Sequence, residues 1–262
     1  MELPGTGTGA DGAPSGDAAP PRVYLHGLGA SSAPYFASCA AHSRLAAGGR
    51  ALLLDLLGFG YTLEEHADAV AAALEAAGVR GADVIAHSMG GSVALVLAVR
   101  HPRLVGRLVL VDANLDPVEP VRGAWGSSGI AAWTEEEFLA GGWREALYRS
   151  AVLPQLPLGG APMARGTVPA LPSAPTLRAL LLDLPLPRTF LRPEADGPVR
   201  GEDELTARGV AVVPVPGCGH NNMLDNPEGF VRAVAEGLRD VSAPGDRAAA
   251  SPPRRPDGPP AR

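Results

Sequence analysis

Short apolar runs alternate with segments of helical periodicity along the first half of the chain. The apolar runs cover residues 22–25, 51–55, 82–87 and 107–112, while the segments between them show helical patterns over residues 34–47, 63–77 and 89–99. Each run is almost continuously apolar, which is typical of strands that are buried on both faces. The pattern therefore predicts an α/β fold, a mostly parallel, doubly wound sheet covered by helices.

The alternation stops at residue 113 and resumes near residue 175. The interrupting segment, about 113–172, holds all three tryptophans of the chain and several prolines that argue against one long helix. After it come a predicted helix over 175–183, a strand over 188–192, a short helix over 202–207 and a strand over 210–215. Asn226 followed by Pro227 is typical of a helix start, so a final helix is predicted from there.

Composition restricts the kind of protein. The chain has 262 residues and a net charge of −6, with no lysine, so one domain with a sizeable core is expected and no electrostatic signal for nucleic acid or anionic membranes exists. Its two cysteines form neither a disulfide framework nor a zinc spacing. The N-terminus lacks the features of a signal peptide, and no apolar run approaches the roughly 18 residues that a membrane span requires. A cytoplasmic protein that contacts no membrane is therefore expected.

Both ends differ in composition from the centre. Residues 1–20 are rich in Gly, Pro, Ala and Thr, and residues 241–262 in Pro, Arg and Ala. Such segments bury too little apolar surface to offset the entropy of ordering, so both are expected to be disordered. The folded domain is expected over residues 21–240.

The most informative stretch surrounds Ser88. A buried strand pattern ends at this serine and a long helix pattern begins directly after it, with small residues at Ala86, Gly90 and Gly91. A turn this tight holds the serine in a strained conformation, with its oxygen projecting from the end of the sheet. The backbone N–H of Met89 then points to where an oxyanion would form.

This stretch resembles the nucleophile elbow of the α/β-hydrolase family, with Ala86 in place of the more usual first glycine. The resemblance extends over about residues 22–240 and implies that segment 113–172 is a small helical cap inserted after the sixth family strand. In the family, a His-Gly loop such as His26-Gly27 follows the third strand, and two antiparallel strands usually precede it. Residues 1–20 show no hairpin pattern, so either the sheet starts late or the gene start is truncated.

A catalytic serine needs a base and an acid. His220, after the last predicted strand, lies where the family places its base. Asp196, after the strand over 188–192, matches the family position of the acid and completes the family order Ser, Asp, His. Glu194 and Asp112 remain alternatives for the acid. The resemblance also implies an oxyanion hole made by the backbone N–H groups of Leu28 and Met89.

The remaining candidate residues are assigned structural roles. His87 is expected to form a local hydrogen bond, and Cys218 to pack. His42, His66 and His101 lie in predicted helices and are expected at the surface. The sequence contains no phosphate loop and no cluster of metal ligands, so no cofactor and no metal are expected.

The predicted reaction is acyl transfer to water. Ser88 attacks a carbonyl, His220 moves the proton, and the acyl-enzyme is then hydrolysed. The expected substrate is a small molecule, a carboxylic ester with an apolar acyl or alcohol part. C–C bond hydrolysis, thioester or lactone hydrolysis, and a non-catalytic ligand receptor on the same scaffold are the alternatives, and the oligomeric state stays open.

Overall fold

A computed structural model describes residues 1–3, 19–46, 49–57, 61–116, 121–122, 132–137, 140–141 and 176–239. Within these ranges the strands are β1 (Glu2–Leu3), β2 (Arg22–Leu25), β3 (Ala51–Leu54), β4 (Ala82–His87), β5 (Val105–Val111), β6 (Arg188–Pro193) and β7 (Val210–Val215). The helices are α1 (Ser32–Ala40), α2 (Ser43–Ala46), α3 (Leu63–Ala76), α4 (Met89–Arg100), α6 (Glu135–Glu137), α8 (Leu177–Asp183), α9 (Glu202–Ala207), α10 (Asn222–Asp225) and α11 (Pro227–Gly237), with a 3₁₀ turn η2 (Glu194–Asp196).

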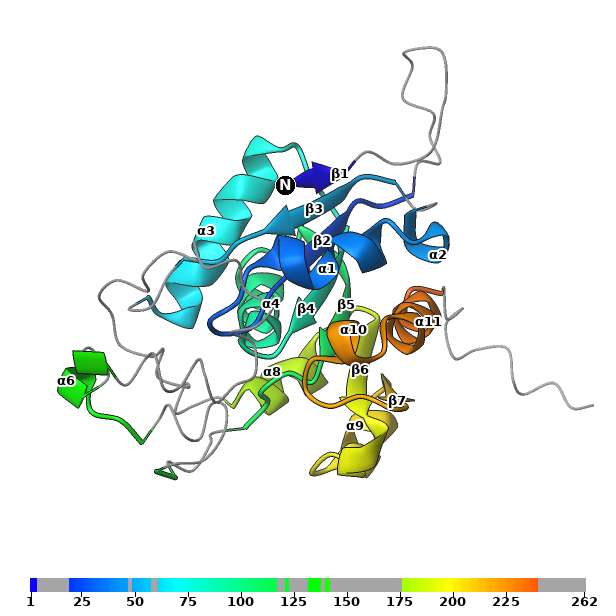
Figure 1. The fold of residues 1–262 in the computed structure, drawn as a ribbon. Coiled ribbons are helices and arrows are strands. Elements are labelled where there is room, and N and C mark those ends of the chain that lie inside the picture. Colours follow the sequence, from blue (N-terminus) through cyan, green and yellow to red (C-terminus); the bar gives the residue numbers. More distant parts are fainter. Residues whose placement is uncertain are drawn as a thin grey trace, which may run out of the picture.

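The strands form one seven-stranded sheet in the order β1-β3-β2-β4-β5-β6-β7 (Figure 1). β1 pairs antiparallel with β3, and all other neighbours pair in parallel. The order reverses around β2, so β2 and β4 lie in the middle of the sheet. The predicted mostly parallel, doubly wound sheet is thereby confirmed.

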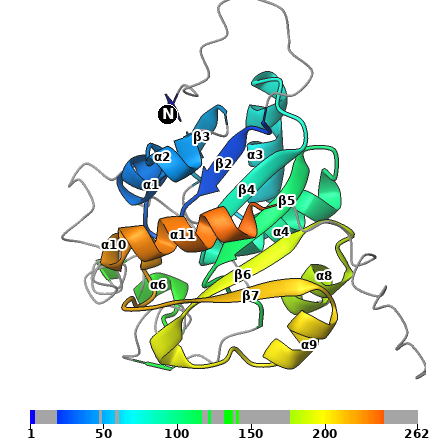
Figure 2. The same ribbon diagram turned by 90° about the vertical axis from the view of Figure 1, so that its right-hand side faces the viewer.

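Helices cover both faces of the sheet (Figure 2). One apolar core joins α3, α4, α8 and α9 to the sheet, and a second core joins α1, α2, α10 and α11 to the opposite face. Successive strand residues alternate between the cores: Val84 and Ala86 belong to the first, and Ile85 between them to the second. This period of two explains why each strand is apolar without interruption.

Polar residues set several helix boundaries. Thr62 caps α3 through a capping box with Glu65, and Thr134 makes the same reciprocal bonds with Glu137. The side chain of Asn226 accepts the Gly229 N–H at the start of α11. α4 ends at Arg100, before a proline that cannot continue a helix.

Four sequence-based expectations differ from the structure. The helix predicted over 34–47 is divided into α1 and α2, and α10 lies where no helix was expected. Two residues of the segment predicted to be disordered, Glu2–Leu3, form β1, and the Met1 ammonium donates to the Leu53 carbonyl at 3.0 Å. The fourth difference is His66, which was expected at the surface and is only 1% exposed, because it lies on the core-facing side of α3.

Most of the expected cap lies outside the described residues. This holds for Trp125, Trp143 and most of residues 117–175. The described part includes Trp133, whose ring lies 5.5 Å from the Arg122 guanidinium carbon. No helix among the described residues is long and apolar enough to cross a membrane.

Candidate active site

Ser88 occupies the tight turn between β4 and α4. Its backbone has φ 51° and ψ −122°, a conformation that non-glycine residues rarely adopt. The Ser88 N–H donates to the Val111 carbonyl at 2.9 Å, which ties the turn to β5, and the Gly91 N–H donates to the Ser88 carbonyl at 2.9 Å. The predicted strained elbow is present. Strain of this kind persists only where the surroundings enforce it, and it gathers at functional sites.

Two glycines allow the elbow to form. A Cβ on Gly90 would lie 2.4 Å from the carbonyl oxygen of His26, and a Cβ on Gly91 would lie 2.4 Å from the Cβ of Ala113. Both distances are far below any van der Waals contact. The first turn of α4 is therefore pressed against the loop after β2 on one side and the segment after β5 on the other.

The loop after β2 packs beside the serine elbow. A Cβ on Gly27 would lie 3.0 Å from the Cβ of Ser88, so this loop touches the serine directly. The N–H groups of Leu28 and Met89, the two residues expected to form an oxyanion hole, make no hydrogen bond to any described residue. Met89 is the first residue of α4, where a helix leaves its N–H without an internal partner.

His26 holds this loop in place. Its Nε2 accepts the Leu56 N–H at 2.9 Å, so its Nδ1 carries the proton and donates to the Gly27 carbonyl at 2.7 Å. Burial lowers the pKa of His26, which keeps the ring neutral and this arrangement of donor and acceptor stable.

His220 lies in the loop between β7 and α10, and its Nδ1 lies 2.6 Å from Oδ2 of Asp112. A carboxylate in this position accepts the Nδ1 proton and leaves the Nε2 lone pair available as a base. The loop is internally tied: Asn222 Nδ2 donates to the Gly219 carbonyl at 2.6 Å, and the Gly219 N–H donates to Asp225 at 2.9 Å. These bonds fix the backbone on both sides of His220.

Asp112 follows the last residue of β5, and its position results from the strand register. His87 and Val111 are partners in neighbouring strands, so Ser88 and Asp112 leave the same edge of the sheet side by side. The Asp112 N–H still donates to the Leu191 carbonyl at 2.8 Å, but its φ of 44° bends the chain out of the sheet. Aspartate tolerates this left-handed conformation better than most residues.

The residue that the structure places against His220 is thus Asp112, not the predicted acid Asp196. β6 continues to Pro193, opposite Val215, and the following turn η2 carries Glu194 and Asp196 into solvent, where both are exposed. Among the described residues, neither of these two carboxylates forms a hydrogen bond or ion pair with His220. An aspartate directly after the strand that neighbours the serine strand was the available signal in the sequence.

His87, expected to bond locally, instead bonds to the loop that carries His220. Its Nε2 lies 2.9 Å from the His220 carbonyl oxygen. Cys218, expected to pack, donates its thiol to the Val215 carbonyl at 3.2 Å, and burial together with nearby carboxylates raises its pKa to about 11. At neutral pH this thiol stays protonated, so it is a poor nucleophile.

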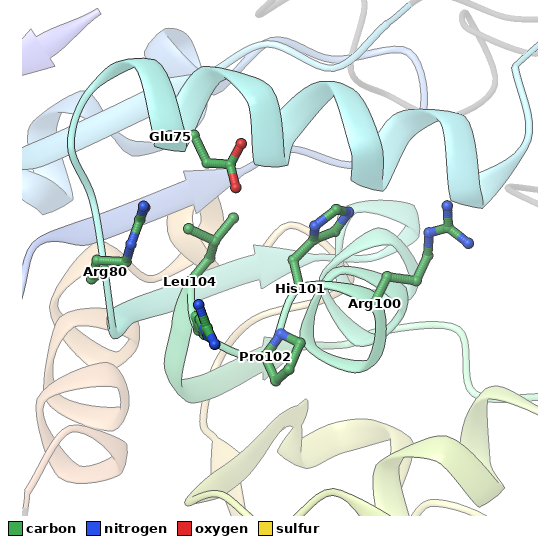
Figure 3. Close-up of a pocket in the computed structure, with 7 residues that line it drawn as sticks. Glu75, Arg80, Arg100, His101, Pro102 and Leu104 are labelled. Atoms are coloured by element: carbon green, nitrogen blue, oxygen red, sulfur yellow. The ribbon is translucent and has the colours of Figure 1, made fainter.

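A separate cavity of about 280 Å³ lies at the other end of α4 (Figure 3). α4 has 12 residues and rises about 1.5 Å per residue, which places this cavity about 18 Å from Ser88. Two of the residues that line this cavity, Arg100 and His101, both bond to Asp68. Among the described residues, no group of three or more His, Cys, Asp or Glu side chains could hold a metal ion.

Comparison with solved structures shows that other proteins share this fold. An esterase from Thermogutta terrifontis has a TM-score of 0.60 at 21% identity, with 91% of each chain covered. The meta-cleavage product hydrolase of Pseudomonas fluorescens has a TM-score of 0.54 at 16% identity, covering 83% of this chain and 90% of that one.

In sequence, a 2-hydroxymuconate semialdehyde hydrolase of Pseudomonas putida is 35% identical over 121 residues, which is 40% of this chain and 42% of that protein. The aligned part thus spans less than half of this relative. A sequence model of the alpha/beta hydrolase family matches residues 23–233, most of the chain. The chain belongs to the alpha/beta hydrolase family.

Proposed function

We propose that the protein is a serine hydrolase in which Ser88 is the nucleophile, His220 the general base and Asp112 the acid. The observation that carries this proposal is the 2.6 Å contact between His220 Nδ1 and Asp112, formed beside a serine with φ 51°. His220 Nε2 takes the proton of the Ser88 hydroxyl as the oxygen attacks a carbonyl carbon. The same imidazole then protonates the leaving group, and water hydrolyses the acyl-enzyme.

The developing negative charge is stabilised by the N–H groups of Leu28 and Met89. Loss of one such donor costs about 3 kcal/mol of transition-state stabilisation in other serine hydrolases. The close approach of Gly27 to Ser88 and the position of Met89 at the start of α4 support this assignment. Fixed donors need no reorganisation during the reaction, which makes them effective.

The proposed substrate is a small carboxylic ester with an apolar acyl or alcohol part. A second candidate is hydrolysis of a C–C bond next to a ketone, which the sequence similarity to a 2-hydroxymuconate semialdehyde hydrolase favours. Both reactions would use the same three side chains. Thioesters and lactones remain further possibilities for the same chemistry, and a non-catalytic receptor is the alternative outside enzymes.

Labelling with a fluorophosphonate probe tests the proposal. Wild-type protein should react covalently at Ser88 and should hydrolyse at least one member of a panel of p-nitrophenyl esters, thioesters, lactones and ketones with a scissile C–C bond. Ser88→Ala should lose labelling and turnover while keeping its circular-dichroism spectrum. Labelling that persists in Ser88→Ala would disprove the assignment of the nucleophile, and a wild type that neither labels nor turns over any substrate would favour a receptor.

A further inference from the structure

His87 is enclosed at the centre of the candidate site. It is the last residue of β4, its side chain is 2% exposed, and its ring centroid lies 4.6 Å from that of His220. Its Nε2 lies 2.9 Å from the His220 carbonyl oxygen, a bond across 133 residues of sequence. A carbonyl oxygen only accepts hydrogen bonds, so Nε2 must carry the ring proton.

The other ring nitrogen faces the loop after β2. Nδ1 of His87 is buried and has no hydrogen-bond partner among the described residues. A Cβ on Gly27 would lie only 2.8 Å from this nitrogen, so the ring fits because residue 27 has no side chain. His87 thus connects three parts of the site: it directly precedes Ser88, it bonds to the loop that carries His220, and it lies against Gly27 in the loop after β2.

The surroundings keep His87 neutral. Burial is the main cause that lowers its pKa well below the usual value, and the neighbouring His220 lowers it further. The groups that face it are His220, His26 and the ring of Tyr35, whose centroid is 5.7 Å away, and none of them is an anion. A neutral ring also avoids charge repulsion when His220 takes up a proton during the reaction.

We propose that His87 is a positioning residue, whose Nε2–H bond to the His220 carbonyl fixes the base relative to Ser88. This inference rests on the proposed function, because it concerns the distance between the nucleophile and its base. Without the bond, Asp112 would be the one hydrogen-bond partner left to His220 among the described residues. A misplacement of about 1 Å in such a site can lower the rate by about 100-fold.

Two variants of similar side-chain length separate the hydrogen bond from simple space filling. His87→Gln keeps an N–H donor near the position of Nε2, whereas His87→Met fills the space without a donor. For each variant, kcat, KM, the second-order rate of fluorophosphonate labelling and the melting temperature are measured beside wild type and Ser88→Ala. We expect His87→Met to lose about 10-fold to 100-fold in kcat and labelling rate with KM within about twofold. His87→Gln should stay within about threefold of wild type.

Equal rates for the two variants, whether both are normal or both impaired, would overturn the inference. A wild type that shows no labelling and no turnover would instead refute the proposed function. The bond itself is then tested in unmodified protein by NMR of ¹⁵N-labelled histidines, which reports which nitrogen carries the proton. At neutral pH His87 should have a neutral ring protonated at Nε2, and a proton on Nδ1 would contradict the geometry.

Discussion

Replacing Asp112 by asparagine removes the charge that faces His220 and keeps the shape of the side chain. Asparagine also tolerates positive φ, so the backbone at φ 44° should stay as it is. The imidazolium formed in the reaction then loses its carboxylate, and the amide no longer enforces the Nδ1–H tautomer. In serine proteases with a buried acid, this change costs about 10⁴-fold in kcat.

The exposure of this pair reduces the expected loss. The side chains of His220 and Asp112 are 51% and 26% exposed, so water screens their attraction. At an effective dielectric constant of about 20, opposite charges about 4 Å apart interact by about 4 kcal/mol, which corresponds to about 10³-fold in rate. We therefore expect Asp112→Asn to lose between about 10²-fold and 10³-fold in kcat, with KM nearly unchanged.

The assay is steady-state hydrolysis of the best substrate in the panel, together with the rate of fluorophosphonate labelling. Asp196→Asn is the matched control, since it makes the same chemical change on an exposed turn, and Glu194→Gln is the second control. Both controls should stay within about twofold of wild type, in line with exposed positions outside the site. A damaging Asp196→Asn beside a normal Asp112→Asn would refute the assignment of the acid.

Three further predictions concern the loop of the oxyanion donors, a helix cap and the buried histidines. Gly27→Ala puts a Cβ 2.8 Å from His87 Nδ1 and should lower fluorophosphonate labelling at least 10-fold, and an unchanged rate would contradict the tight fit. Thr62→Ala removes the capping box of α3 and should lower the free energy of unfolding by about 1 kcal/mol in urea titrations without changing kcat; an equal stability would show that the cap contributes nothing. His26, His66 and His87 have pKa values lowered by burial in the folded state, so the unfolded chain binds more protons below its histidine pKa of about 6.5. The free energy of unfolding should therefore be fully retained above about pH 6.5 and decrease as pH falls from there towards 5, and a profile that is flat over this range would contradict the assignment.

Local patterns were sufficient to predict most elements of this chain. The apolar runs predicted six of the strands, and Asn226 marked a helix start that the structure contains. The elbow could also be predicted from the sequence, because a serine between a buried strand and a helix with small neighbours permits few backbone conformations. These features depend on residues within a few positions of one another. Their physical causes, side-chain periodicity and backbone sterics, act locally.

The carboxylate that faces His220 could not be identified in this way. Asp112 and Asp196 both follow buried strands, and each offers a carboxylate within four residues of a strand end. The decision depends on how far β6 extends beyond β5, and on the turn at Asp112 that directs its side chain to His220. Strand lengths and turns become fixed only when neighbouring strands and their loops meet.

The histidines show the same difference between what local sequence and what tertiary structure determines. Local spacing in the sequence determined the fold and the place of Ser88, and the family resemblance indicated the segment that supplies His220. The tertiary structure alone decided that His66 is buried and that His87 bonds to the His220 carbonyl, 133 residues away. Burial and long-range hydrogen bonds arise from the packing of distant segments, and a one-dimensional pattern of residues carries no information on which of these segments come into contact.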